Sequence, residues 1–563
     1  MLVVSVLWGT IAGLALVSAP PTLTQPVSQL PEFQPRPAEP LPTQVLPPPS
    51  ELLPPLPDSQ RPELPTGDVP ETVVVQRYNV TGSTIFSPEE LEAITKEFTG
   101  RVTITEIFQA RSAITQLYVS KGYVTSGAFI PEQTLQGGVV EIRVVEGTVE
   151  EIRVAGNQRL SPGYVQSRLA LATGAPLNRD RLLQALQLLQ QNPLIQNLSA
   201  ELSAGIRPGT SLLTVQITEA DSFNTSLIFD NQRSPSVGTD RRQLQITEAN
   251  LLGLGDSLAL TYTNTDGSNA FDASYTLPLS PYNTTVTFSY STSGSRVIEL
   301  PFDVLRINSG SYTYEASLRQ PIIQTPSQEL ALGLTFSRRQ SEATLLGGTI
   351  PFPSLGADNE GRSVVSALRF VQEFTDRSSE QVFAARSQFS IGLDALGATI
   401  NNALPDSRFF TWRGQAQYVR LLAPETLLLV RADLQLADRP LLSLEQFGLG
   451  GVNTVRGYRQ DLLLTDNGIL ATAEVRLPIL RIPELPLLLQ VVPFVDIGTG
   501  WNSGLRPNPT ESTLISAGLG LRLQVSNQLT ARFDWGIPLS TPSPAARTWQ
   551  ENGLYFSVVY TPF

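Results

Sequence analysis

The sequence has 563 residues and a formal net charge of −12, because 51 Asp and Glu outweigh 39 Lys and Arg, and it contains neither His nor Cys. Without these two residue types the chain has no Ser-His-Asp triad, no imidazole metal ligand, no thiolate nucleophile and no disulfide. The acidic balance argues against a nucleic-acid partner, which would favour a basic face. We therefore expect neither an ordinary enzyme nor a cofactor.

The N-terminal 71 residues are predicted to be a targeting segment and a spacer. Residues 1–19 are mostly apolar or small and end in Val17-Ser18-Ala19, a pattern typical of a cleaved signal peptide, although the usual positive charges are missing. An uncleaved anchor is the alternative. Between residues 20 and 70 lie 17 of the 44 prolines. Proline fixes φ and removes an amide donor, so we expect residues 20–71 to form an extended Pro-rich linker, with an SH3-type ligand as the alternative.

A repeat with an offset of about 74 residues follows the linker. VTGS at 80–83 recurs as VAGN at 154–157, and VEIRVVEG at 140–147 recurs as LTVQITEA at 213–220. Each copy turns at a Gly, starts a helix at a Ser-Pro pair and continues with a second apolar-periodic helix, at 104–121 and 179–191. We therefore predict two α+β domains of βααββ order, at 72–147 and 148–220.

Residues 221–563 alternate between apolar and polar positions, as strands with one apolar face do. The clearest segments are 286–290, 312–318, 330–336 and 529–535, and others lie near residues 223, 258, 271, 364, 383, 412, 427, 469, 489, 515 and 554. We predict about sixteen antiparallel strands of roughly 10 residues, the length that crosses a bilayer when tilted. Charged residues on the polar faces, among them Glu474, Arg532 and Asp534, favour a wet lumen over the alternative, a soluble β-sandwich. The longest interruptions are expected at 292–309, 338–362 and 437–467.

The third interruption carries the most informative motif. Val455-Arg456-Gly457-Tyr458 follows a glycine-rich stretch, and Phe494, Asp496 and Gly498 lie on one face of a predicted strand. The apolar residues on the other face of that strand imply that Asp496 points into the lumen. A carboxylate and an arginine inside a barrel each need a partner, so we predict that the loop folds inward and that Arg456 pairs with Asp496. The alternative is two unrelated polar residues.

These motifs resemble those of a known family. The repeats are similar to polypeptide-transport-associated (POTRA) domains. The VRGY sequence at 455–458 and the F-x-D-x-G sequence at 494–498 resemble two motifs of the two-partner secretion transporters, the haemolysin secretion/activation family. The resemblance implies a transmembrane β-barrel in the outer membrane, with the POTRA domains in the periplasm. It also implies that the VRGY loop enters the pore and that its arginine contacts the barrel-wall aspartate.

The resemblance implies function and partners as well. Such a protein exports one large secreted partner, whose N-terminal secretion domain binds the POTRA domains as an unfolded chain, in type V secretion. Its other partners are outer-membrane lipid and the barrel-assembly machinery that inserts it, with no nucleic acid. Some family members carry an N-terminal plug helix, which the Pro-rich segment is not suited to form. The main alternative is an outer-membrane protein insertase or preprotein translocase of the same superfamily; a passive porin and an outer-membrane enzyme are more distant.

Overall fold

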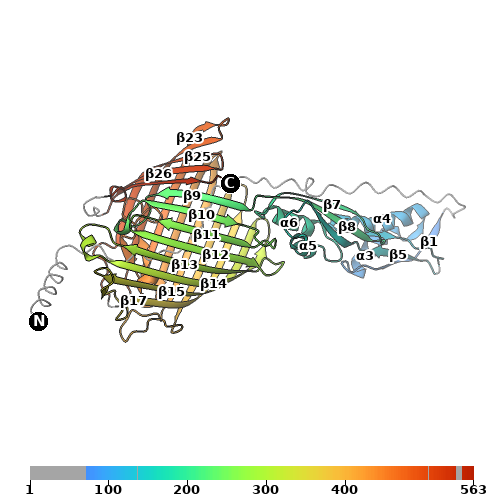
Figure 1. The fold of residues 1–563 in the computed structure, drawn as a ribbon. Helices are drawn as coiled ribbons and strands as arrows, with labels where there is room; N and C mark the ends of the chain where they lie inside the picture. The colour runs from blue at the N-terminus through green and yellow to red at the C-terminus, as the bar shows by residue number, and fades with distance from the viewer. Residues whose placement is uncertain (1–71, 136, 505, 541–547, 563) are drawn as a thin grey trace, which may run out of the picture. The chain divides into compact units, whose positions relative to one another are not determined.

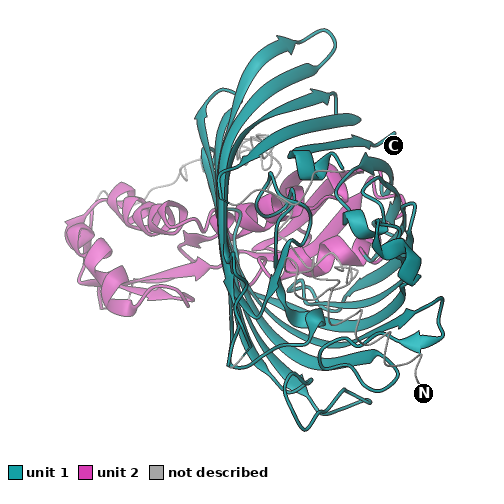
Figure 2. Cartoon of the chain, turned by 90° about the vertical axis from the view of Figure 1, so that its left-hand side faces the viewer, with its two compact units in different colours: residues 1–44, 222–251, 256–563 teal, residues 45–221, 252–255 magenta. Residues whose placement is uncertain are grey.

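The computed structural model describes residues 72–135, 137–504, 506–540 and 548–562 and divides the chain into two compact units (Figure 1, Figure 2). The predicted signal peptide, 1–19, and Pro-rich linker, 20–71, lie outside the described residues. Within them, no helix combines the length and the apolar character that a bilayer crossing requires. Each unit is described below by itself.

The first α+β repeat begins at residue 73. Its elements are β1 (Val73–Val75), β2 (Arg77–Thr81), α3 (Pro88–Thr95), the 3₁₀ turn η1 (Lys96–Phe98), β3 (Gly100–Val102), α4 (Ile104–Ser120), β4 (Gly127–Phe129) and β5 (Val139–Val145). The helices start where capping boxes form, with Ser87 and Glu90 at α3 and Thr103 and Glu106 at α4. The sheet order is β2-β5-β4, and β1 pairs separately with β3. That extra pair is an addition to the predicted βααββ order.

The second repeat has the predicted order without additions. Its elements are β6 (Thr148–Ala155), α5 (Pro162–Ala170), α6 (Arg179–Gln190), β7 (Ile195–Ala204) and β8 (Thr210–Glu219). The sheet order is β6-β8-β7, with β6 parallel and β7 antiparallel to β8. Leu169, Leu182 and Leu186 of the two helices are fully buried, as are Leu213 and Val215 of β8. The helices therefore cover one face of the sheet and form the core with it.

Each repeat has its own glutamate at, or directly after, the end of its last strand. The Glu146 carboxylate accepts hydrogen bonds from the Thr84 amide at 2.7 Å and the Tyr118 hydroxyl at 2.9 Å. The equivalent Glu219 accepts from the amides of Gln158 at 2.6 Å and Leu160 at 2.9 Å. Partial burial acts to raise the pKa of each carboxyl, but these hydrogen bonds outweigh it and hold the pKa below its usual value. Each glutamate thus fixes the turn that precedes the first helix of its repeat.

The unit drawn in teal in Figure 2 is a closed antiparallel barrel of sixteen long strands (Figure 1). They are β9 (Phe223–Asp230), β10 (Arg241–Glu248), β11 (Ser257–Asn264), β12 (Ser268–Pro278), β13 (Thr285–Arg296), β14 (Asn308–Gln324), β15 (Gln328–Leu345), β17 (Arg362–Arg377), β18 (Gln381–Leu393), β19 (Phe410–Ala423), β20 (Thr426–Ala437), β23 (Asn467–Ile482), β24 (Leu487–Trp501), β25 (Thr513–Val525), β26 (Leu529–Pro538) and β27 (Leu554–Tyr560). The last strand pairs with β9 and closes the cylinder. Closure leaves no open edge, which a sheet in lipid requires.

Shorter elements lie in the connections between the barrel strands. They are the two-residue strand β16 (Ile350–Pro351), the strands β21 (Phe447–Leu449) and β22 (Leu463–Thr465), and the 3₁₀ turns η2 (Pro235–Val237), η3 (Phe302–Leu305), η4 (Ser443–Glu445) and η5 (Gln550–Asn552). The long loops follow β13, β15, β18, β20, β24 and β26, which run in the same direction as β9. These loops therefore lie at the barrel end away from the start of β9. We call this end the loop end.

The two faces of the barrel wall differ as predicted. Phe288, Leu318 and Val495 are 58 %, 45 % and 53 % exposed on the outside, whereas Asp496 and Asp534 face inward and are buried. An apolar outer face around a polar interior is the pattern of an outer-membrane barrel. The predicted fold class, a transmembrane barrel of about sixteen strands preceded by α+β repeats, is therefore confirmed.

Some strand and loop predictions were wrong in detail. β14 has 17 residues and β15 has 18, so the connections expected at 292–309 and 338–362 shrink to 297–307 and 346–361. The strand ends there carry Ser, Gly and Arg, which give no apolar alternation. β10 lacked a prediction because its outward face has only two large apolar residues, Leu244 and Ile246. The third connection spans 438–466, close to the predicted 437–467.

Candidate functional site

The connection between β20 and β23, residues 438–466, lies against the inner barrel wall, and we call it the pore loop. Within it β21 pairs with β22, with Phe447 opposite Thr465 and Leu449 opposite Leu463. This short hairpin brings the two ends of segment 450–462 together, and that segment carries the VRGY sequence. The predicted inward folding of the loop is thus present in the structure.

Arg456 and Asp496 form a two-point ion pair inside the barrel. The Arg456 Nε atom lies 2.8 Å from Asp496 Oδ2, and Nη2 lies 2.8 Å from Oδ1. The Arg456 backbone amide also donates to Asp496 Oδ2 at 3.1 Å. The predicted contact is therefore made, with the parallel geometry that a planar guanidinium gives to a carboxylate.

Two further carboxylates surround Arg456. Its Nη1 atom lies 3.0 Å from Glu474 Oε2 on β23 and 3.8 Å from Asp534 Oδ1 on β26. Arg476 binds Glu474 at 3.0 Å, and Arg532 binds Asp534 at 2.6 Å. Three arginines thus balance three carboxylates, which we call the wall cluster. Burial of these charges is tolerated because each one is paired.

The sequence analysis placed Glu474, Arg532 and Asp534 on polar strand faces but did not connect them with Arg456. The missing information was the strand register, which sets Thr472 opposite Asp496 and Glu474 opposite Phe494. The three wall-cluster carboxylates bind arginines, and no acidic group within the described residues has the arrangement of a metal site.

The other motif residues give the loop its close fit. The Phe494 ring lies 3.4 Å from the Arg456 guanidinium carbon, so the arginine stacks on the aromatic face. A Cβ atom at Gly498 would lie 2.7 Å from Leu449 Cδ2 and 3.0 Å from Val455 Cγ2. Gly498 therefore leaves the space that the buried side chains of Leu449 and Val455 occupy.

Gly457 and Tyr458 fix the loop against the last strands. Gly457 has φ +97°, and a Cβ there would lie 3.1 Å from the Gly536 carbonyl oxygen of β26, so the position favours glycine. The Gly457 amide donates to the Tyr555 hydroxyl at 3.0 Å. The buried Tyr458 hydroxyl lies 2.8 Å from the Ile515 carbonyl oxygen and 2.7 Å from that of Ser540. All seven predicted site residues therefore meet in one place.

A second ion group holds the loop at another point, and the sequence analysis missed it. Arg459 lies 2.9 Å from Glu299, in the connection between β13 and β14, and 3.3 Å from Glu551 in η5. We call these three residues the loop-end group. The two partners of Arg459 come from two separate connections with no periodic pattern, so the sequence offered no signal for these contacts.

Comparison with known proteins identifies the family. The family model described as "Haemolysin secretion/activation protein ShlB/FhaC/HecB" matches residues 209–523, and the "POTRA domain, ShlB-type" model matches 73–147. The haem/haemopexin transporter protein HuxB of Haemophilus influenzae is 24% identical over 325 residues, 54% of this chain and 53% of that protein. The outer membrane transporter CdiB of Dickeya dadantii is 23% identical over 381 residues, 66% of each chain. The chain thus spans about half to two thirds of these relatives.

Solved structures show the same fold. CdiB from Escherichia coli superposes with a TM-score of 0.67 at 24% identity, covering 89% of this chain and 93% of that one. BamA from Haemophilus ducreyi lacking POTRA domains 1–3 gives a TM-score of 0.52 at 14% identity, covering 87% and 100%. The family match spans more than half of the chain and includes the pore loop. The chain therefore belongs to the haemolysin secretion/activation (ShlB/FhaC/HecB) family of outer-membrane two-partner secretion transporters, which are not enzymes.

Proposed function

We propose that this chain exports a large secreted partner protein through its barrel by two-partner secretion. The observation that carries the proposal is the pore loop bound to the inner wall by the Arg456–Asp496 pair. Charge pairs fix one position of the loop, yet in a wet lumen water can hydrate the same charges when the loop shifts. The loop can therefore shape a channel without sealing it permanently.

The strand order supports one path for the exported chain. The pore loop binds β23, β24 and β26, and β13 lies half a turn away in the sixteen-strand cylinder. The inward face of β13 and β14 carries uncharged hydroxyl groups, which we call the hydroxyl wall: Thr285, Thr287, Ser289, Ser291, Ser293, Ser295, Ser309, Ser311, Thr313 and Ser317. Such groups offer weak hydrogen bonds to any backbone. The two charged residues on the same inward face, Glu315 and Arg319, are held in ion pairs, with Arg339 at 3.2 Å and with Glu373 at 2.8 Å. A lumen cavity of about 290 Å³ lies beside Thr285, Thr287 and Ser317, and arginines and glutamates of β14 to β19 line much of the rest of it.

The proposed domains are 72–147 and 148–220 for the two POTRA repeats and 221–563 for the barrel. Strand β7, at ten residues, pairs only with β8 among the described strands. An extended segment of the partner's N-terminal secretion domain could add to such an edge, because main-chain hydrogen bonds give affinity without demanding one sequence. Outer-membrane lipid would contact the apolar outer face, and the barrel-assembly machinery would insert the barrel.

Co-expression with candidate exoproteins tests this proposal, with the culture medium assayed for each. We expect one of them to be released only when this chain is present. We also expect deletion of residues 72–147 to abolish release while bilayer conductance of the inserted barrel persists. If the chain instead restored insertion of other barrel proteins and released no exoprotein, the insertase alternative would replace this proposal.

A further inference from the structure

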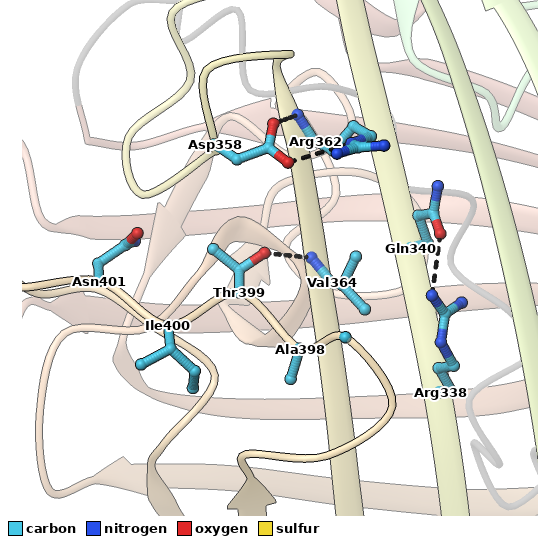
Figure 3. A pocket seen from close by; sticks show the side chains of 10 residues that line it. Arg338, Gln340, Asp358, Arg362, Val364, Ala398, Thr399, Ile400 and Asn401 are labelled. Atoms are coloured by element: carbon cyan, nitrogen blue, oxygen red, sulfur yellow. Dashed lines mark hydrogen bonds and ion pairs between the residues drawn. The ribbon is translucent and has the colours of Figure 1, made fainter.

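A polar cavity of about 340 Å³ lies at the loop end of the barrel, between β15, β17 and the connection 394–409 (Figure 3). Its volume is within the range of roughly 300–1,000 Å³ that small-molecule sites occupy. Arg338 and Gln340 of β15 lie along one side, and Thr399 and Asn401 of the connection lie across from them. The proposed export path does not use this cavity.

Strand register places the cavity on the outer face of the barrel. Arg338 is opposite Tyr314 on β14, and Tyr314 is opposite Tyr290 on β13, so the three side chains form one outward row. Tyr314 is 52 % exposed, and its ring centroid lies 5.2 Å from that of Tyr290. Tyrosines on the outside of such barrels gather at the height of the lipid headgroups. Arg338 is therefore held at headgroup height, near the loop end.

One cation of the cavity, Arg338, has no acidic ion-pair partner among the described residues and can bind an anion. Arg338 Nε donates to the Leu396 carbonyl at 3.0 Å, and Nη2 donates to the Gln340 side-chain oxygen at 3.2 Å. These two bonds orient the guanidinium, and within the described residues no carboxylate forms an ion pair with it. Asp358, the acidic residue of the lining, is bound to Arg362 at 3.0 Å (Figure 3), and Glu360 is bound to the same arginine at 2.8 Å. Arg338 therefore contributes a positive charge that no acidic partner offsets.

Two other donor groups lie near this charge. The Gln340 side-chain oxygen is taken by Arg338, which leaves the amide nitrogen of Gln340 as a donor. The Thr399 oxygen accepts from the Val364 amide at 2.8 Å, which leaves the hydroxyl proton of Thr399 to donate. An arginine with neutral donors around it is the arrangement that binds phosphate oxygens.

We propose that this cavity binds the phosphate group of an outer-leaflet lipid headgroup. The guanidinium of Arg338 contacts the phosphate oxygens, Gln340 and Thr399 donate to the remaining oxygens or to headgroup hydroxyls, and the acyl chains lie along the apolar wall below. The row of Tyr290, Tyr314 and Arg338 selects a lipid over free phosphate, because it sets the cation at the depth where headgroups lie. The site is separate from the wall cluster and does not depend on the export proposal.

The test uses the full chain purified in detergent, incubated with lipid A carrying its phosphates, with dephosphorylated lipid A, or with inorganic phosphate as competitor. Native mass spectrometry counts the lipid retained per barrel. We expect retention of phosphorylated lipid A only. Loss of one charge-assisted contact in Arg338→Gln should lower the affinity by about tenfold or more. The matched control is Arg242→Gln: Arg242 shares the outward face with Phe229 at the same end, but it is paired with Asp266 at 3.1 Å. This control should retain lipid as the unmodified chain does.

Three results would overturn the proposal: unchanged retention in Arg338→Gln, equal retention of dephosphorylated lipid A, or displacement of the lipid by inorganic phosphate at equal concentration. Arg338→Lys keeps the charge but loses the planar donor pair, so it should bind more tightly than Arg338→Gln. Heat-modifiable migration on a gel reports that each variant barrel is folded.

Discussion

Arg456 and Asp496 are 40 positions apart in the sequence, yet the guanidinium of one and the carboxylate of the other meet through two contacts of 2.8 Å inside the barrel. The backbone amide of Arg456 binds the same carboxylate, so both the side chain and the main chain of the loop are fixed. This pair determines where the pore loop lies, and the first prediction concerns it.

Replacing Arg456 with Ala leaves the buried carboxylates of Asp496 and Glu474 without this partner. Removal of one partner of a buried ion pair costs about 3–5 kcal/mol, which here falls on loop docking and not on the strand ladder. We expect the barrel to insert normally and secretion to fall at least about tenfold, a change that corresponds to 1.4 kcal/mol or more. Immunoblots of medium and outer membrane measure both.

The matched control for this variant is Arg439→Ala. Arg439 is in the same loop but is 41 % exposed and contacts its sequence neighbour Asp438. Surface pairs of this kind contribute little, so secretion should stay near the unmodified level. Secretion that is equal in the Arg456 and Arg439 variants would contradict the assigned role of Arg456.

Gly498 tests the packing of the loop against β24. An alanine there places its Cβ 2.7 Å from Leu449 and 3.0 Å from Val455, and overpacking of this kind costs about 1–3 kcal/mol. We expect faster tryptic cleavage of the pore loop in Gly498→Ala. Gly294→Ala is the control, because a Cβ at Gly294 has no heavy atom within 4 Å. If both variants were cleaved at the unmodified rate, the close fit at Gly498 would have no energetic role.

The loop-end group should restrict the pore mouth. Arg459→Gln removes the contacts of 2.9 Å to Glu299 and 3.3 Å to Glu551, so it frees the pore loop from two other connections. We expect more frequent open-channel events in planar bilayers. Glu299→Gln should have a smaller effect because Glu551 still binds Arg459. An opening frequency that is unchanged in Arg459→Gln would show that these contacts do not limit the channel.

Acid should weaken the first POTRA repeat through Glu146. Its pKa is lowered on folding below the ordinary 4.5, so its stabilising contribution is complete above that pH and is lost as the pH falls through the folded-state pKa. Glu146→Gln should be less stable at pH 7 and show a smaller further loss between pH 5 and pH 3. Among the described residues all α-helices lie before residue 221, so urea unfolding followed by helical circular dichroism reports this unit. Equal acid sensitivity of both proteins would contradict the assignment.

Local periodicity explains what the sequence could predict. The second helices were expected at 104–121 and 179–191 and are found at Ile104–Ser120 and Arg179–Gln190. Alternation likewise predicted most barrel strands and the inward direction of Asp496. These features depend on neighbours within one element, which a single sequence contains.

Non-local register explains what the sequence could not predict. Glu474 and Asp534 join the wall cluster because antiparallel pairing aligns β23, β24, β25 and β26, and nothing within any one strand encodes that alignment. The partners of Arg459 come from two distant connections. The outward position of Arg338 beside Tyr314 became visible only once β14 and β15 were found to extend past their apolar stretches.

The central claim is that an unfolded partner passes through the lumen along the hydroxyl wall, and site-specific photocrosslinking to a stalled partner tests it most directly. Thr287 faces the lumen cavity, whereas its neighbour Phe288 is 58 % exposed on the outer face. A photoreactive residue at 287 should crosslink the partner during export, and the same residue at 288 should not. Crosslinking at 288 and none at 287 would contradict passage through the barrel.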